Sequence, residues 1–199
     1  RAGLESVIGD NTIAGNQYPV RTFPDLIERC LRDNDVRDVS RGVYVNGGTL
    51  TTETAWPSAA PYVLAGSLVI AAEGHLTLEG GVLLKLVVAR GWHDDLDIDV
   101  HGGLTTQGDE GVVRITALTH DLGGDTNGDG VVTLPAPGDW GRIVARQGST
   151  FDIVGTEIGY GGGGNDGNCC GGERVSDASL SIEGGEGVVR NTFIHHSAA

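Results

Sequence analysis

The chain has 199 residues with 39 % hydrophobic residues and 34 glycines, a mixture that excludes a disordered chain and argues against a helical protein. Its formal net charge of −14 would repel nucleic acid and anionic membrane surfaces, so we expect neither as a partner. The longest apolar runs fall short of the roughly 18 residues that a membrane span needs, so we expect no membrane insertion.

Four segments share one pattern, in which short alternating apolar stretches are separated by glycine corners. They cover residues 66–86, 98–115, 141–158 and 179–189. Three short strands per turn are typical of a solenoid of parallel strands, with roughly 20 to 25 residues in each turn. Equivalent residues of successive turns would lie about 4.8 Å apart and form aliphatic ladders. The residues predicted to point inward are Leu68, Ile70, Leu76, Leu78, Val82, Leu84, Ile98, Val100, Ile115, Ile143, Ile153, Ile158, Leu180 and Ile182.

This pattern predicts an all-β fold, a parallel β-helix with loop insertions, as a single module over residues 1–199. The alternative is an antiparallel β-sandwich, which needs hairpin turns between its strands. Residues 46–48 and 127–130 contain Asn-Gly pairs that could supply two such turns, but most other bends lack this signature. Residues 23–31 fit either a short helix that begins at Pro24 or a distorted turn of the solenoid.

Several stretches resemble secreted bacterial right-handed parallel β-helix repeat proteins. They are Val45–Thr51 through Trp56, Pro61–Leu64, Gly74–Val82, Gly123–Gly130 and Gly138–Gly141. The resemblance covers about residues 40–165. It implies a right-handed β-helix and a secreted or cell-surface location, and since most such proteins have no assigned activity it implies little about chemistry.

The sharpest local motif is Asp125-Thr126-Asn127-Gly128-Asp129-Gly130-Val131, which fits the start of a calcium-binding loop. Calcium takes six to eight oxygen ligands, and oxygens at alternate positions around a glycine turn can wrap one ion. We expect Asp125, Asn127, Asp129 and the carbonyl of Val131 to begin the shell. The twelfth position is Ala136 instead of the usual glutamate, so Asp121, Asp139 or water would have to complete it. The alternative is a turn of Asp, Asn and Gly residues that binds no ion.

Asp94, Asp95, Asp97 and Asp99 place four carboxylates within six residues. In a strand, Asp95, Asp97 and Asp99 share one face, either as a cation or acid–base site or as a solvated face with Ile98 and Val100 turned inward. Among motifs of polysaccharide-hydrolysing β-helices, only the Asp94-Asp95 pair is present. Arg114, Arg142 and Arg146 are not placed by the sequence beside an acidic cluster, as lyases require. We therefore expect no enzymatic activity.

The remaining chemistry-bearing residues leave alternatives open. Trp56, Trp92 and Trp140 can stack on sugars or pack against loops. Strand alternation would aim His195 and His196 to opposite faces. Cys30, Cys169 and Cys170 are odd in number, and one disulfide or three thiols are both compatible with the sequence.

The sequence thus predicts an extracellular structural β-helix module, acting as a scaffold, adhesin stalk or filament subunit and stabilised by Ca²⁺. Exposed strand edges at its ends would associate with other copies or flanking domains of the same protein, end to end. We expect the module to be a piece of a longer chain or a stacking unit. The alternative is a carbohydrate-binding or polysaccharide-cleaving β-helix, whose partners would be glycans.

Overall fold

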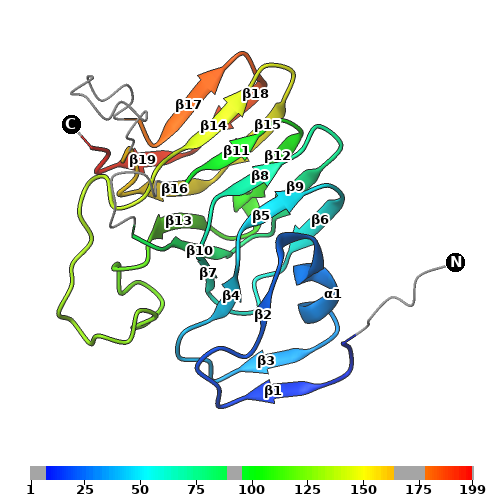
Figure 1. Ribbon diagram of the computed structural model, residues 1–199, viewed down its shortest axis with the longest axis vertical. Coiled ribbons are helices and arrows are strands. Elements are labelled where there is room, and N and C mark those ends of the chain that lie inside the picture. The colour runs from blue at the N-terminus through cyan, green and yellow to red at the C-terminus, as the bar shows by residue number, and fades with distance from the viewer. Residues whose placement is uncertain (1–7, 89–95, 164–177, 199) are drawn as a thin grey trace, which may run out of the picture.

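The computed structural model describes residues 8–88, 96–163 and 178–198, and within these ranges most strands lie in three sheets (Figure 1). Sheet I contains, in spatial order, β2 (Arg21–Thr22), β4 (Val43–Val45), β7 (Tyr62–Leu64), β10 (Leu83–Leu86), β13 (Val113–Ala117), β16 (Thr156–Gly159) and β19 (Phe193–His195). Sheet II contains β5 (Gly48–Leu50), β8 (Leu68–Ile70), β11 (Ile98–Val100), β14 (Ile143–Arg146) and β17 (Leu180–Glu183). Sheet III contains β6 (Glu53–Trp56), β9 (His75–Leu78), β12 (Gly103–Gln107), β15 (Thr150–Val154) and β18 (Glu186–Arg190).

From β4 onward the chain visits sheets I, II and III in turn and then returns to sheet I. We call three successive strands, one in each sheet, a rung. Every pairing between named strands is parallel, so the antiparallel sandwich is wrong. The chain is therefore all-β with parallel strands in stacked sheets, an arrangement compatible with a parallel β-helix.

The Asn-Gly pairs do not make hairpins, because each lies in a connection between strands of two different sheets. Gly47 and Gly48 carry the chain from β4 in sheet I to β5 in sheet II, with φ values of +80° and +116°. A Cβ on Gly47 would lie 2.6 Å from the backbone of Gly66, so glycine lets the corners of two rungs stack closely. The second pair lies in the long connection between β13 and β14.

The core lies between the three sheets, and their inward side chains form one cluster. Its ladders follow the strand register, as in the column that joins Leu68, Ile98, Ile143 and Leu180. Of the residues predicted to point inward, all those before residue 160 are at most 1 % exposed. The prediction fails at the C-terminal end, where Leu180 is half-buried and Ile182 is 53 % exposed, because no described strand lies beyond β17 in sheet II.

A short helical segment covers the N-terminal end of the stack. The 3₁₀ turn η1 (Pro24–Leu26) leads directly into α1 (Ile27–Leu31), so the helix predicted from Pro24 is present. Ile27 and Leu31 are buried against the first rung. Beneath α1 in Figure 1, β1 (Thr12–Ala14) pairs in parallel with β3 (Asp35–Arg37).

Two carboxylates of this segment accept hydrogen bonds from backbone N–H groups of the first rung. The Asp25 carboxylate accepts from the Thr51 N–H at 3.1 Å, and the Glu28 carboxylate accepts from the Ala55 N–H at 2.9 Å. The Ala55 N–H is the main cause that holds the pKa of Glu28 below its ordinary value. Edge strands with free N–H groups can pair with other chains, and these carboxylates make such pairing less favourable because they already bond two of the N–H groups.

Two further features complete the described ranges. A second 3₁₀ turn, η2 (Gly108–Glu110), connects β12 to β13. In the parts of the chain that the structure describes, helices are too short and too polar to cross a membrane.

Replacing Ile70 by alanine should lower the free energy of unfolding by about 2–5 kcal/mol, because it opens a cavity in a fully buried ladder. Val69 on the same strand points outward, so Val69→Ala should lower it by about 1 kcal/mol or less. Urea unfolding of both variants measures the difference. Equal losses would contradict the assignment of the inward face.

Candidate functional site

The motif predicted to bind calcium lies in the long connection between β13 and β14, which folds against the outer face of sheet I (Figure 1). Its anchor is Lys85, the only lysine of the chain. Lys85 lies on β10 between Val63 and Thr116 and is 0 % exposed. Outward residues of a sheet are normally solvated, so the burial of Lys85 comes from the loop that covers it.

The Lys85 ammonium holds the start of the motif. Its Nζ donates to the Gly124 carbonyl at 3.1 Å and to the Thr126 hydroxyl at 2.7 Å. Burial lowers the pKa of Lys85 to about 8, although the charges of Asp121 and Asp125 oppose that shift. The loop is thus attached to the sheet by a buried cation with two hydrogen-bond partners.

Asp125 organises the turn that follows. Its carboxylate accepts from the N–H groups of Gly128 at 2.7 Å, Asp129 at 3.0 Å and Gly130 at 2.8 Å. These bonds, that of Gly130 first, hold the pKa of Asp125 below its ordinary value, and the charge of Arg41 adds to the effect. A carboxylate that gathers successive N–H groups fixes a tight loop, as the motif requires.

Asn127 and Asp129 are linked through Thr133. The Asn127 amide donates to the Thr133 hydroxyl at 2.9 Å, and that hydroxyl donates to Oδ2 of Asp129. The other oxygen of Asp129, Oδ1, is buried and has no hydrogen-bond partner within the described ranges. Asn127, Asp129 and Thr133 also line a cavity of about 200 Å³, together with Val87, Val88, Leu118 and Thr119.

The other predicted ligands are placed differently. Val131 follows the turn and is 79 % exposed. Asp139 accepts from the Thr119 hydroxyl at 2.7 Å and from the Ala136 N–H at 3.0 Å, so it holds the far end of the loop. Asp121 resembles Asp129, because its Oδ1 is buried and lacks a partner among described residues.

These oxygens fit a hard cation in chemistry but do not form a closed shell. An unpaired carboxylate oxygen is unfavourable to bury, and a bound cation would offset that penalty at Asp129. Yet within residues 8–88, 96–163 and 178–198, no group of three or more His, Cys, Asp or Glu side chains converges as metal ligands do. Backbone carbonyls and water would have to supply the rest of a calcium shell.

The two described aspartates of the acidic stretch, Asp97 and Asp99, lie on the outward face of the chain at β11 (Ile98–Val100). Asp97 and Asp99 alternate with the buried Ile98, as predicted for a solvated strand. Asp97 accepts from the Arg142 N–H at 2.9 Å, and Asp99 accepts from Nε of Arg146 at 2.6 Å. Both carboxylates therefore take part in contacts between strands, while Asp94 and Asp95 lie outside the described residues.

Sequence patterns missed a cluster of histidines around Tyr160. The centroid of the Tyr160 ring lies 5.2 Å from that of His120, 5.6 Å from that of His195 and 5.0 Å from that of His196. The Nδ1 atoms of His195 and His196 are 2.6 Å apart, so the prediction that they face opposite sides is wrong. The alternating side-chain directions of a strand do not extend to His196, because its backbone has a φ of +49° and is not extended.

A carboxylate pairs with this cluster across strands. Glu157 lies 3.2 Å from Nε2 of His195 and accepts from Nε of Arg114 at 3.0 Å. Gly159 leaves room for the His195 ring, since a Cβ there would lie 2.6 Å from Cε1. These contacts depend on the register in which β16 pairs with β19. The sequence pattern does not specify that register, so it could not predict the cluster.

The aromatic residues considered for sugar stacking are buried. Trp56 and Trp140 are both 0 % exposed, and Nε1 of Trp140 donates to the Gly159 carbonyl at 2.8 Å. Trp92 lies outside the described residues, as do Cys169 and Cys170, while Cys30 packs half-buried against the core.

The chain was compared with protein-family models, curated proteins and solved structures, and it matches none of them.

The buried ammonium of Lys85 should make stability depend on alkaline pH. Its folded pKa of about 8 lies below the ordinary value of 10.5, so between these values the unfolded chain binds more protons. The free energy of unfolding should therefore rise from pH 8 to pH 10.5, by up to about 3 kcal/mol. Urea unfolding should show this rise in the native chain relative to Lys85→Met, which corrects for other alkaline groups. A constant difference between the two proteins would contradict it.

Proposed function

We propose that this chain is a right-handed parallel β-helix module with a structural role at the cell surface or outside the cell, in which calcium stabilises the connection between β13 and β14. The observation that carries this proposal is the repeated return of the chain to the same three sheets in register. A module of this kind transmits force and holds distance through its stacked strands, as a scaffold or stalk requires.

The hand of the helix follows from general chain geometry. Successive strands of sheet I are parallel and are joined by connections that leave the sheet and return. Crossovers between parallel strands of one sheet are right-handed in about 98 % of cases, because twisted strands pack back onto the sheet in that sense.

The outward charges support a structural role because they pair between rungs. Arg146 on β14 bonds Asp99 on β11 and also Glu183 on β17, so one guanidinium joins three successive strands of sheet II. The partners of Arg146 help keep its pKa above the ordinary value, the Asp99 carboxylate first. Such ladders brace the stack along its axis, whereas a catalytic site would gather these groups around one bound substrate.

The calcium assignment rests on the loop. Asp125 already folds the turn, and Asp129, which lines the cavity, carries a buried carboxylate oxygen without a hydrogen-bond partner among the described residues. In this proposal Asp125, Asn127, Asp129 and the Val131 carbonyl contribute oxygens, and Asp121 adds one where the loop meets Lys85. Calcium would supply positive charge to these oxygens and hold the loop in one conformation.

Secretion and a surface location rest on the resemblance to secreted β-helix repeat proteins together with the acidic charge, which keeps a surface protein soluble. Other copies or flanking domains of the same protein would be the partners, through the ends of the stack.

Calcium should raise the melting temperature. At a hundredfold excess over the dissociation constant, binding stabilises a folded chain by about 2.7 kcal/mol, which corresponds to about 5–11 °C at this size. Asp129→Asn keeps the side-chain shape but removes the charge, so most of the shift should be lost. Asp109→Asn, an exposed acidic residue in η2, serves as the matched control and should keep the shift. Identical melting curves in calcium and in chelator would remove calcium from the proposal.

A structural module should neither bind nor cleave glycans. We expect no signal on a glycan array and no release of reducing ends from polysaccharides, both measured with calcium present. Saturable binding or release of reducing ends would support the carbohydrate-active alternative and contradict the structural role.

A further inference from the structure

The guanidinium of Arg41 lies directly over the turn that Asp125 organises. A Cβ placed on Gly128 would be 2.0 Å from Nη2 and 2.5 Å from Cζ of Arg41, so the guanidinium fills the space that a side chain at residue 128 would need. Gly128 has a φ of +76°, a conformation that glycine adopts readily. The glycine of the motif thus lets a positive group from a distant part of the chain contact the turn.

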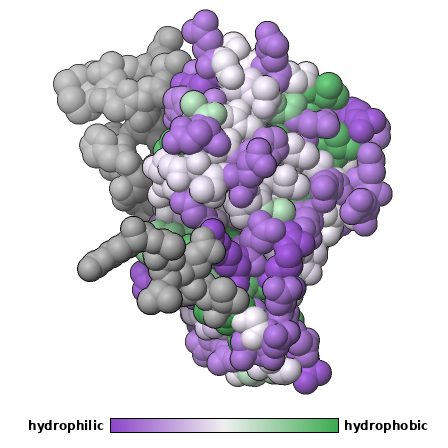
Figure 2. All heavy atoms as spheres, turned by 90° about the vertical axis from the view of Figure 1, so that its right-hand side faces the viewer, coloured by the Kyte–Doolittle hydropathy of each residue, from purple (hydrophilic) through white to green (hydrophobic). Residues whose placement is uncertain are grey.

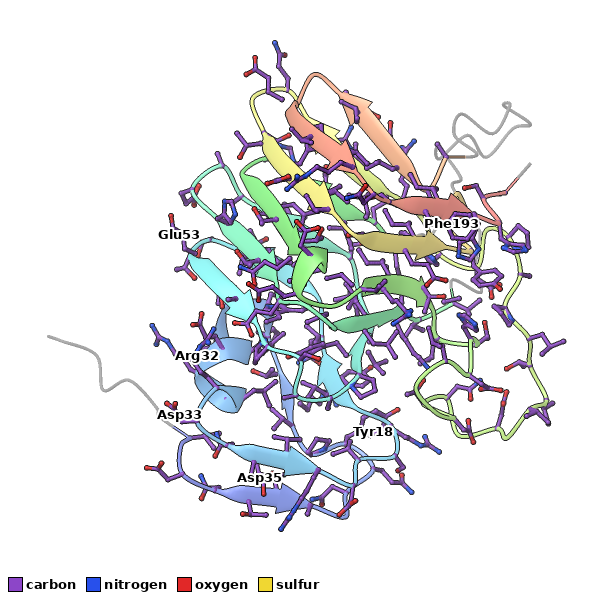
Figure 3. All side chains as sticks on the ribbon, turned by 180° about the vertical axis from the view of Figure 1, so that it is seen from behind. Tyr18, Arg32, Asp33, Asp35, Glu53 and Phe193 are labelled. Atoms are coloured by element: carbon purple, nitrogen blue, oxygen red, sulfur yellow. The ribbon has the colours of Figure 1, made fainter. Side chains whose placement is uncertain are left out.

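Arg41 is held in this position from its other side. Its N–H donates to the Gln17 carbonyl at 2.9 Å, and its Cζ lies 5.8 Å from the centroid of the Tyr18 ring. The Tyr18 ring in turn packs edge-on against Tyr44 of β4, with 5.5 Å between the two centroids. In Figure 3, Tyr18 lies on the same side of the molecule as the long connection, whereas Arg32 lies on the other side. The cation–π contact with Tyr18 therefore fixes the charge of Arg41 beside the turn.

The charge of Arg41 is not neutralised by an ion pair among the described residues, since none of their carboxylate oxygens lies within 4 Å of its guanidinium. The side of Arg32, which faces the viewer in Figure 2, carries many hydrophilic residues, and there Arg32 forms ion pairs with two glutamates. Arg41 instead faces the acidic turn. The bond from the Gly130 N–H is the main cause of the lowered pKa of Asp125, and the charge of Arg41 adds to it.

A fixed positive charge beside this turn acts on the calcium-free and the calcium-bound states in opposite directions. In the calcium-free state it offsets the mutual repulsion of the Asp125 and Asp129 carboxylates. In the calcium-bound state it repels the ion. Because the first effect stabilises the free turn and the second destabilises the loaded turn, both weaken the binding of calcium.

We propose that Arg41 takes the place of a metal ion in the calcium-free turn and thereby sets the affinity of the turn for calcium. This proposal rests on the calcium site of the proposed function. The affinity of protein loops for calcium depends on the number of charges at the site, and Arg41 subtracts from the charge of the carboxylates. It moves the turn toward dissociation constants of about 10⁻⁴–10⁻³ M, the range of extracellular calcium-binding modules. The turn then loads where calcium is plentiful and keeps Arg41 as its counter-charge where calcium is scarce.

Removal of the charge tests this role. Arg41→Gln keeps a polar side chain but removes the positive charge, so the dissociation constant for calcium should fall about threefold to tenfold. Arg41→Glu adds a carboxylate and should lower the dissociation constant further. Isothermal titration calorimetry of the whole chain with calcium chloride measures each value.

Three controls separate the local charge from other effects. Arg37→Gln removes the same charge from β3, where Arg37 is exposed and pairs with Asp35 at 3.4 Å, and should leave the dissociation constant unchanged. Arg41→Lys keeps the charge and should bind calcium nearly as weakly as the native chain. The gain from Arg41→Gln should shrink when the ionic strength rises from about 0.02 M to about 0.5 M, because salt screens a charge at the surface, whereas an effect of packing would persist. Far-UV circular dichroism of each variant confirms that the chain is folded.

The calcium-free protein provides an independent measurement. In chelator, Arg41→Gln should melt at a lower temperature than the native chain, because the carboxylates of the turn lose their counter-charge. In saturating calcium this difference should shrink or change sign. The calcium-dependent rise in melting temperature should therefore be larger in the variant than in the native chain.

The outcomes distinguish the role of Arg41 from the calcium site itself. If Arg41→Gln binds calcium no more tightly than the native chain, the role of Arg41 is overturned and the calcium site remains. Equal gains in Arg41→Gln and Arg37→Gln would also overturn it, because the effect would then belong to the net charge. Calcium binding by Arg41→Gln but not by the native chain would support the role of Arg41 and remove calcium from the proposed function. If no protein of the series binds calcium, both proposals are overturned.

Discussion

Hydrogen bonding between parallel strands fixes which side chains stand above one another, and the rest of this structure depends on that register. Leu68, Ile98 and Ile143 stack because their strands pair residue for residue. A slip of one residue would turn such a column out of the core and carry the outward carboxylates into it. The close corners at Gly47 and Gly66 oppose such a slip, since they leave no room for a side chain. Register therefore couples the apolar core to the ionic contacts outside it.

The long connection after β13 shows how this architecture adds a feature without disturbing the register. β14 resumes pairing with β11 after an excursion from residue 118 to residue 142, and the ladders on either side remain in line. The excursion is attached sideways by Lys85, whose ammonium bonds Gly124 and Thr126. Its acidic turn is thereby presented outside sheet I, with the core unaffected.

Much of the fold could be predicted from sequence, because alternation of apolar residues and glycine corners are local properties. They identified the parallel ladders and the outward placement of Asp97 and Asp99. Burial that depends on distant segments could not be predicted this way. Lys85 is buried by a loop some 40 residues later, and Ile182 is exposed because no described strand follows it in its sheet. The motif of the candidate calcium site could be located, but not the partners of its carboxylates, since backbone groups and Thr133 determine them.

The position of α1 at the start of the stack gives the molecule a direction. The segment that contains Ile27 and Leu31 packs against the first rung, and Asp25 and Glu28 accept hydrogen bonds from the N–H groups of Thr51 and Ala55 there. A strand edge acts as a template for another strand through its unpaired N–H and C=O groups, so the side of the first rung that α1 covers is a poorer template than a bare edge.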